Sequence, residues 1–459
     1  MLTGVKRALF ALSDKSGSEA FARFLINKGV EIFATEGTAK YLSEKGIPVK
    51  ELSSITGFSE RCGGRVKTLN EEIFSRILCR PGDNEYSEKF DLVFVDLYPF
   101  EKSKSIENID IGGVSLIRAA AKNYENVIVV SDREDSAFVM RLLKEKGEVP
   151  LKERKHLAFK AFRRTMLYDF EISLWLGLND SEVKALRYGE NPHQKAFFYP
   201  LLGSKEAFDF HGDKSPSFNN IYDAYRAWLL VNEFEKPTCA IIKHSSPCGV
   251  AMADRPEIAF RKALECDPLS AYGGVVALNV LPEEKVLKEI EKKFFDLVVL
   301  PESPTFDFKR RYIIPKFWFS RWDIRSAFSG LLIQEPDNQF AIKGDLEEDV
   351  IFSFKVVKHL YSNAICVVKD GATVGLCGGQ PSRIFAVKIA LSRAGERAKG
   401  AVLASDGFFP FSDSVEEAYK HGIRVIIAPK GSKRDEEVME KARELGIKLI
   451  LVGERHFRH

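Results

Sequence analysis

The residues with the clearest chemical potential are Lys243 and His244, which follow a short apolar run. That run, Cys239-Ala-Ile-Ile242, lies between Pro237 and Pro247, so it predicts a short buried strand ending in a loop. Ligands of open α/β sheets bind outside the carboxyl ends of strands, and both side chains are therefore expected to face a pocket. An imidazole titrates near neutral pH, which suits a general base. On these residues alone, a loop-capping histidine beside a solvated lysine remains an alternative.

Two segments near the N-terminus have the composition of phosphate-binding loops. Ser13-Asp-Lys-Ser-Gly17 and Thr35-Glu-Gly-Thr38 each place hydroxyl groups and a glycine just before an expected helix. Free backbone N–H groups and the helix dipole favour an anion there. Ordinary helix capping explains either segment equally well by itself. The candidate phosphate ligands are Ser13, Lys15, Thr35, Gly37 and Thr38.

Cations, a phenol and a carboxylate follow on later loops of the same region. Gly63-Gly-Arg-Val-Lys-Thr-Leu69 adds two cations and a hydroxyl beside glycines, a combination suited to a phosphate or an oxyanion. Tyr98 follows an expected strand, and Asp110 precedes a helix that carries Lys122. Solvated surface charge explains any one of them, but their repeated position after strands favours a shared site. These candidates are Arg65, Lys67, Thr68, Tyr98, Asp110 and Lys122.

Polar loops recur in the second half of the chain. The segment 186–194 is dense in hydrogen-bonding groups, which is typical of a ligand loop. Glycines at 273 and 274 precede an expected strand and allow close backbone approach to a ligand. The candidate residues of this half, besides Lys243 and His244, are Arg187, Tyr188, His193, Gly273, Asp296, Asn363, Arg383, Phe408 and Arg455.

Length and composition limit the possible number of domains and the possible classes of function. A chain of 459 residues predicts two or three domains, and a net charge of +3 from 68 basic and 65 acidic residues disfavours nucleic acid as a partner. The seven cysteines form no Cys-x-x-Cys pair and no cluster at zinc spacing, which predicts a reducing compartment and no structural metal. No apolar stretch approaches ~20 residues, so no membrane association is expected. We therefore expect a soluble cytoplasmic protein.

The elements that must position these residues alternate between strands and helices. Arg7–Ser13, Glu31–Thr35, Asp91–Leu97 and Val127–Ser131 have the pattern of buried parallel strands, with helical spacing between them. We predict a first α/β domain at 1–150, a helical connector at 151–183 and a second α/β region at 184–459. The second region includes a hairpin with an Asp-Gly turn at 370–371. Residues 301–325 show no pattern that predicts an element.

Several long motifs, in one order along the chain, resemble one family. The chain is similar to the bifunctional purine biosynthesis enzymes that join AICAR transformylase to IMP cyclohydrolase. The matching motifs are Arg65-Val-Lys-Thr68, Asp110-Ile-Gly-Gly113, Ala119-Ala-Ala-Lys-Asn123, Arg187-Tyr-Gly-Glu-Asn-Pro-His-Gln194, Ile242-Lys-His244 with Pro247-Cys-Gly249, Ser362-Asn363, Gln380-x-Ser-Arg383, Ser405-Asp with Phe408-Phe-Pro-Phe411, and Arg455-His-Phe-Arg-His459.

The resemblance implies a methylglyoxal-synthase-like parallel-sheet domain, followed by a larger transformylase region of two cytidine-deaminase-like subdomains. It implies formyl transfer from 10-formyltetrahydrofolate to the amine of AICAR, then closure of formyl-AICAR (FAICAR) to IMP, with no metal or redox cofactor. A homodimer is implied, with transformylase sites across the subunit interface. In these roles, Lys243, His244 and Asn363 would serve formyl transfer, and Lys67, Tyr98, Asp110 and Lys122 would serve ring closure. The remaining candidates would bind substrate.

The chain departs from the family pattern at a few positions. Thr35-Glu-Gly-Thr38 replaces Thr-Gly-Gly-Thr, Lys67-Thr-Leu-Asn-Glu71 replaces Lys-Thr-Leu-His-Pro, and His244-Ser-Ser-Pro247 replaces His-Thr-Asn-Pro. The alternative from another functional class is a protein that binds a nucleotide as a signal and catalyses no reaction. The departures in the first domain would fit this alternative. A dehydrogenase or a P-loop enzyme is disfavoured, because neither glycine-rich fingerprint occurs.

Overall fold

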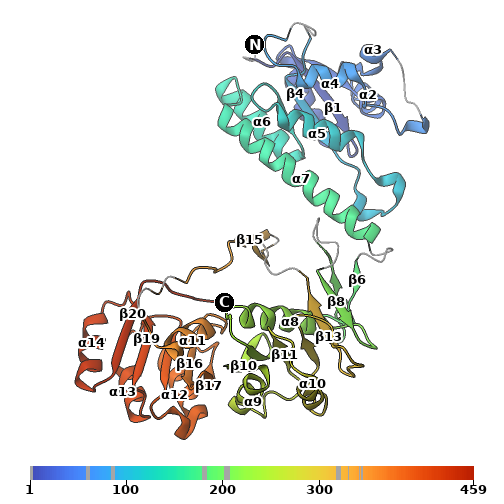
Figure 1. The fold of residues 1–459 in the computed structure, drawn as a ribbon. Coiled ribbons are helices and arrows are strands. Elements are labelled where there is room, and N and C mark those ends of the chain that lie inside the picture. The colour runs from blue at the N-terminus through green and yellow to red at the C-terminus, as the bar shows by residue number, and fades with distance from the viewer. Residues whose placement is uncertain are drawn as a thin grey trace. The chain divides into compact units, whose positions relative to one another are not determined.

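The computed structural model describes residues 4–57, 62–83, 88–177, 183–200, 207–316, 322–328, 330–340, 342 and 345–459. The chain forms two compact units, Met1–Ser181 and Glu182–His459, whose elements are labelled in Figure 1. Most of the segment 151–183, expected as a connector, is the helix α7 (Leu151–Gly177). Its side chains Leu157, Ala158 and Ala161 belong to the core of the first unit.

The first unit is built on a five-stranded parallel sheet. The strand order is β3-β2-β1-β4-β5, and every pair of neighbours is parallel. The four expected strands are confirmed, while the two-residue strand β3 is too short and too exposed to give a sequence signal. The strands are β1 (Arg7–Leu12), β2 (Glu31–Ala34), β3 (Lys50–Glu51), β4 (Leu92–Asp96) and β5 (Ile128–Val130).

Among the residues that the structure describes, six further α-helices connect and cover these strands. Asn70, one of the departures from the family pattern, caps α4 by accepting a hydrogen bond from the Glu72 N–H at 2.8 Å. The helices are α1 (Glu19–Asn27), α2 (Glu36–Glu44), α3 (Ser53–Thr56), α4 (Glu71–Leu78), α5 (Gly112–Lys122) and α6 (Arg133–Lys146), with 3₁₀ turns at Cys62–Gly64, Phe100–Lys102 and Ile106–Asn108.

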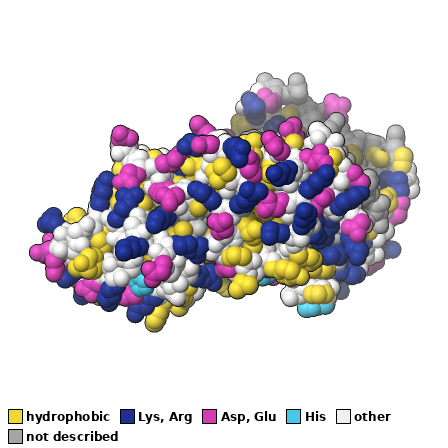
Figure 2. All heavy atoms as spheres, turned by 60° about the horizontal axis from the view of Figure 1, so that its bottom comes forward, with side chains coloured by type: hydrophobic (Ala, Val, Ile, Leu, Met, Phe, Trp, Pro, Cys, Tyr) yellow, Lys and Arg dark blue, Asp and Glu magenta, His cyan; other side chains and the backbone are white. Residues whose placement is uncertain are grey.

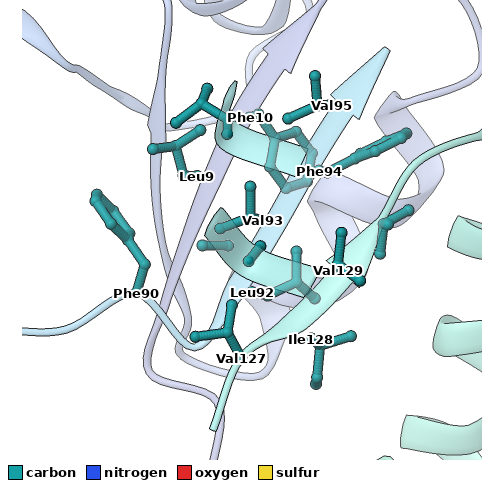
Figure 3. Packing of buried hydrophobic residues seen from close by; sticks show 14 of the residues in the cluster. Leu9, Phe10, Phe90, Leu92, Val93, Phe94, Val95, Val127, Ile128 and Val129 are labelled. Atoms are coloured by element: carbon teal, nitrogen blue, oxygen red, sulfur yellow. The ribbon is translucent and has the colours of Figure 1, made fainter. Parts of the chain in front are cut away.

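The core of the first unit centres on aromatic side chains from β1 and β4. Phe10 and Phe94 are register partners on these strands, and their rings meet edge to face with centroids 5.2 Å apart. Figure 3 shows both rings among Leu9, Val93 and Val95. Because the two strands carry the loops that follow them, this packing also sets the position of those loops.

Replacing Phe10 with Ala should lower the free energy of unfolding of the first unit by about 3–5 kcal/mol, because it leaves a cavity in a close-packed core. Urea titration followed by far-UV circular dichroism measures the change. Leu151→Ala, at an exposed position on α7, is the control and should leave the midpoint almost unchanged. An equal midpoint for both variants would contradict this account of the core.

The second unit contains one continuous sheet of eleven strands, in the order β20-β19-β18-β16-β17-β10-β9-β11-β12-β13-β8. The expected α/β class is confirmed, and the likeness of its halves to cytidine deaminase stays a prediction. Strands β10 and β17 join the halves by antiparallel pairing at Ala251 and Ala372. The strands are β8 (Phe208–His211), β9 (Thr238–Lys243), β10 (Ser246–Met252), β11 (Val275–Leu278), β12 (Leu297–Val299), β13 (Tyr312–Pro315), β16 (Ile365–Lys369), β17 (Ala372–Cys377), β18 (Val402–Ser405), β19 (Val425–Pro429) and β20 (Lys448–Val452).

Helices cover both faces of this sheet (Figure 1). Successive residues of a strand point to opposite faces, so Ile242 belongs to the buried cluster to which α8 and α11 contribute, while Ile241 belongs to the cluster of α9 and α10. Helices α12, α13 and α14 extend the second layer. The helices are α8 (Phe218–Val231), α9 (Pro256–Cys266), α10 (Glu284–Glu291), α11 (Glu348–Val357), α12 (Arg383–Ala394), α13 (Asp413–Lys420) and α14 (Asp435–Glu444), with a 3₁₀ turn at Gly395–Ala398.

Two small ribbons stand beside the large sheet. One pairs β6 (Lys184–Ala185) with β7 (Phe197–Phe198), and the other pairs β14 (Asp323–Ala327) with β15 (Gly330–Gln334). The segment 301–325, for which no element was predicted, contains β13 and the start of β14. Residues 317–321 within it lie outside the described residues.

The strand expected at Cys239–Ile242 is confirmed, but the loop expected after it is wrong. Strand β9 turns directly into β10 through His244 and Ser245. Pro247, expected as a boundary, lies inside β10, where the pairing with β9 shifts register. A bulge of this kind accommodates a proline within a paired strand.

Charges of both signs share the face drawn in Figure 2. On the face drawn in Figure 2, Lys and Arg side chains alternate with Asp and Glu side chains, and apolar side chains lie between them. This pattern agrees with the nearly balanced composition. Within the described ranges, no helix combines the length and apolarity that crossing a membrane requires.

Candidate functional site

A cavity of about 570 Å³ lies at the carboxyl ends of the first unit's strands. Strand β1 has β2 and β3 on one side and β4 and β5 on the other, so the direction of strand addition reverses at β1, a position where ligands of parallel sheets bind. Ten of the eleven candidates predicted for this unit line the cavity. They are Ser13, Lys15, Thr35, Gly37, Thr38, Arg65, Lys67, Thr68, Tyr98 and Asp110.

One end of this cavity has the features of an anion site. The Lys15 ammonium donates a hydrogen bond to the Ser13 carbonyl at 3.0 Å. Its Cε would lie 3.7 Å from a Cβ added to Gly37, in the first turn of α2. The helix N-terminus and the lysine therefore present positive charge together. Glu36, the departure from the family pattern, is exposed and is not among the residues lining the cavity.

Two of the expected phosphate ligands also hold protein partners. The buried Thr38 hydroxyl accepts a hydrogen bond from the Leu12 N–H at 3.1 Å and so fastens α2 to β1. Arg65 contacts both carboxylate oxygens of Glu107, and this hydrogen-bonded pair raises the pKa of Arg65. Thr38 therefore shapes the cavity wall, while Arg65 reaches the cavity rim as one half of an ion pair.

Asp110 lies at the start of α5, where burial raises the pKa of its carboxyl group. The carboxylate accepts hydrogen bonds from the Gly113 N–H at 2.6 Å and, more weakly, from the Tyr98 N–H at 3.4 Å. A Cβ added to Gly113 would lie 2.5 Å from Asp110 Oδ2. A glycine is therefore required for the carboxylate to take this position.

A residue of α7 supports Asp110. The Tyr168 hydroxyl accepts a hydrogen bond from the Asp110 N–H and donates one to the Asn108 carbonyl, both at 2.9 Å. Sequence reasoning missed Tyr168, because a tyrosine on a charge-rich helix gives no local sign of such a contact. The helix expected as a connector is thus part of the site's framework.

Lys122 is not brought to this cavity. It lies in the last turn of α5, whereas Asp110 precedes the first, and eleven helical residues separate such positions by about 16 Å. Lys122 instead lines a second cavity of about 640 Å³ with Arg118, Phe74 and Phe162.

One edge of the eleven-stranded sheet gathers the candidates of the second unit. Strand β9 ends at this edge. Following the parallel and antiparallel pairs across the sheet, β11, β12 and β16 begin at the same edge, and β17 and β18 end there. Strand β9 ends at this edge but β11 begins there. The rule that ligands bind at the carboxyl ends of parallel strands therefore does not explain why the candidates gather at this edge. Directly at the edge stand Lys243, His244, Gly273, Asp296, Asn363 and Phe408.

Lys243 is held against the loop before β11. Its ammonium donates a hydrogen bond to the Tyr272 carbonyl at 2.8 Å. Gly273 has φ +69°, and a Cβ there would lie 2.9 Å from Lys243 Nζ. The glycine predicted to allow close approach to a ligand therefore also makes room for the lysine.

The turn at His244 and Ser245 is tight, with φ values of 80° and 62° at these residues. Left-handed φ at both central positions is what a type I′ hairpin requires, and it disfavours residues other than Gly, Asn and Asp. The Asp223 carboxylate on α8 accepts hydrogen bonds from the Ser245 N–H at 2.7 Å and the His244 N–H at 3.4 Å. Burial raises the pKa of Asp223. Sequence reasoning missed this residue.

Asn363 is fixed to the loop before α12. Its backbone N–H and its side-chain amide both donate to the Gln380 carbonyl, at 3.1 and 2.7 Å, which leaves the side-chain oxygen as an acceptor. Three strand spacings separate β9 from β16, or about 14 Å. The Tyr361 side chain, two residues before Asn363, approaches Ser245 and so links the two segments.

The two candidate arginines near the C-terminus differ in environment. Arg383 is buried and pairs with the fully buried Asp406, and it also donates to the Ser405 hydroxyl at 3.1 Å. Arg455 is exposed, with its guanidinium 4.3 Å from the centre of the Phe457 ring. Arg383 thus stabilises the edge between β16 and β18, whereas Arg455 is accessible.

The segment of Arg187 and Tyr188 is fastened to the start of α8. The Phe218 N–H donates to the Tyr188 carbonyl at 3.0 Å. The Arg187 guanidinium lies 4.8 Å from the centre of the Tyr188 ring and donates to its hydroxyl at 3.1 Å. His193, further along, is exposed. Since β8 ends at the same edge and α8 begins there, these residues border the Lys243 edge.

Comparison with known proteins decides the family. Residues 120–393 match the model of the AICARFT/IMPCHase bienzyme, and residues 17–125 match the MGS-like domain. The chain belongs to the AICARFT/IMPCHase family. It is 40% identical to the bifunctional purine biosynthesis protein PurH of Acetivibrio thermocellus, over 99% of this chain and all of the relative. The PurH proteins of Clostridium acetobutylicum and Persephonella marina are 41% and 40% identical, with the same coverage.

Membership gives the chain two activities, AICAR formyltransferase and IMP cyclohydrolase, on an MGS-like domain and a larger α/β region. The expected family, fold class and function are thereby confirmed. The alignment with the Acetivibrio protein spans 517 positions, more than the 459 residues of this chain, so that relative carries segments that this chain lacks.

Replacing Gly113 with Ala should slow cyclisation of FAICAR about 10- to 100-fold, because the added Cβ displaces the Asp110 carboxylate. Conversion of supplied FAICAR to IMP, followed by absorbance, measures the rate. Ser115→Ala on the same helix is the matched control and should remain within twofold of the parent. A Gly113→Ala variant with full cyclohydrolase activity would contradict the assignment of Asp110 to the site.

Proposed function

We propose that formyl transfer takes place at the sheet edge that carries Lys243 and His244. The acceptor is the 5-amino group of AICAR, a weak nucleophile because its lone pair delocalises into the imidazole ring and the carboxamide. His244 takes a proton from this amine as its nitrogen attacks the formyl carbon. The exposed imidazole on a fixed two-residue turn supports this role, since it faces outward from a rigid support.

The attack gives a tetrahedral intermediate whose oxygen carries negative charge. Lys243 stabilises this oxygen, and Asn363 orients the formyl group or the base. The intermediate collapses by expelling the nitrogen of tetrahydrofolate, which takes up a proton. The donor is 10-formyltetrahydrofolate, in line with the folate co-substrate of the family.

The nucleotide is bound by the other candidates at and beside this edge. In this proposal, Arg187, His193 and Arg455 bind its phosphate, and Tyr188 binds its sugar or base. Arg383 acts mainly through its pair with Asp406, which positions the neighbouring strand ends. The remaining contacts come from Gly273, Asp296 and Phe408.

Ring closure takes place in the cavity of the first unit. The carboxamide nitrogen of FAICAR attacks the formyl carbon, and loss of water then gives IMP. Lys67, Tyr98 and Asp110 handle the protons and the oxyanion, while Ser13, Lys15, Thr35, Gly37, Thr38, Arg65 and Thr68 hold the phosphate end. Lys122 would have to act from its own cavity at the far end of α5.

The enzyme works as a homodimer in the cytoplasm. The family resemblance implies a transformylase site across the subunit interface, in which His244 of one chain acts with Asn363 of a second copy. The seven cysteines, all free thiols, fit a reducing compartment.

The observation that carries the formyl-transfer assignment is the exposed His244 beside the anchored Lys243. Replacing His244 with Ala should lower formyl transfer about 10²- to 10⁴-fold, as expected for loss of a general base. Cyclisation of supplied FAICAR should stay within twofold, because it uses the other unit. Full formyl transfer by this variant, with 10-formyltetrahydrofolate and AICAR, would refute the role of His244.

Mixing two inactive variants tests the shared site. When His244→Ala and Asn363→Ala chains are unfolded together and refolded, half of the dimers are mixed, and each has one intact site if the residues come from different chains. About a quarter of the parental formyl transfer should return, as the twofold symmetry of a dimer dictates. No recovery, with dimers present by light scattering, would mean that both residues act within one chain.

A further inference from the structure

The turn that carries His244 depends on a carboxylate from another element. Asp223 lies in the second turn of α8, and neither the motifs nor the chemistry of formyl transfer assigns it a part. Its Oδ1 accepts the Ser245 N–H at 2.7 Å and lies 3.4 Å from the Ser245 hydroxyl, and its Oδ2 accepts the His244 N–H at 3.4 Å. One carboxylate thus accepts both backbone N–H groups of the turn.

These contacts matter because the turn has an unfavourable backbone. His244 and Ser245 both have left-handed φ, and neither is a residue that adopts it readily. A left-handed residue other than glycine is destabilising and persists only when its surroundings hold it. Hydrogen bonds to a charged acceptor are stronger than neutral ones, so Asp223 is well suited to hold this turn.

We propose that Asp223 is a positioning residue for formyl transfer: it holds the His244–Ser245 turn in the left-handed conformation that aims the imidazole at the AICAR amine. The inference rests on the proposed role of His244. Asp223 does not contact the substrate and acts only through the backbone of the turn. The Tyr361 hydroxyl also approaches Ser245, so the turn has a second neighbour in the segment before Asn363.

The conformational argument gives a specific rescue. Glycine adopts left-handed φ without steric cost and is the preferred second residue of a type I′ turn. If Asp223 acts by holding this conformation, Ser245→Gly should restore part of the activity that Asp223→Ala loses. A residue needed only for folding of α8 would gain nothing from that glycine.

Asp223→Ala should lower kcat for formyl transfer about 10- to 100-fold, the effect of misplacing a catalytic group by about 1 Å. The KM for AICAR and the cyclisation of FAICAR should stay within twofold. Asp223→Asn should fall between, because its carbonyl oxygen still accepts from Ser245 while its NH₂ group cannot accept from His244. The double variant Asp223→Ala, Ser245→Gly should recover at least about fivefold. Asp254→Ala, an exposed aspartate that follows β10 at the opposite edge, is the control.

A double-mutant cycle separates this inference from the assignment of His244. In the His244→Ala background, Asp223→Ala should cause no further loss, since Asp223 acts through the imidazole. An inactive His244→Ala with a fully active Asp223→Ala would overturn the inference alone. A fully active His244→Ala would overturn the role of His244 and the inference with it. Equal loss of both activities in Asp223→Ala, with a lowered melting temperature and no rescue by glycine, would reduce Asp223 to a structural residue.

Discussion

The antiparallel pairing of β10 with β17 holds the candidate formyl-transfer residues at one edge of the large sheet. Through this pairing, the end of β9 faces the same way as the start of β16, although more than a hundred residues lie between them. Separate halves would leave Lys243 and Asn363 with no fixed relation. The buried pair of Arg383 with Asp406, and the hydrogen bonds that tie Asn363 to Gln380, then refine the positions that the sheet sets.

The first unit reaches its site by a different route. Its strands are all parallel, so the loops that follow them meet at one edge of the sheet. The aromatic side chains packed on β1 and β4 fix the positions of these two strands and therefore of the loops that follow them. Small residues then decide which polar groups can approach. Gly113 admits the Asp110 carboxylate, and Gly37 lies beneath the Lys15 side chain. In both units, a missing Cβ beside a charged group is part of the site's geometry.

The sequence predicted four of the five strands of the first unit because each of the four is a continuous apolar run. It predicted ten residues around the cavity because hydroxyls, cations and glycines gather on its loops, with Ser13, Thr35 and Tyr98 just after strands. It did not predict the hairpin at His244, since Pro247 is ordinarily a strand boundary and here lies at a bulge. Asp223 and Tyr168 could not be found by sequence reasoning, because their partners are backbone groups distant in the chain. The distance of Lys122 from the cavity of Asp110 follows from the length of α5, which cannot be read from the motif.

Each of the four clusters of buried apolar side chains lies wholly within one unit. Each unit therefore has an apolar interior assembled from its own described residues. A substitution within one of these interiors is thus accommodated first by neighbouring side chains of the same unit.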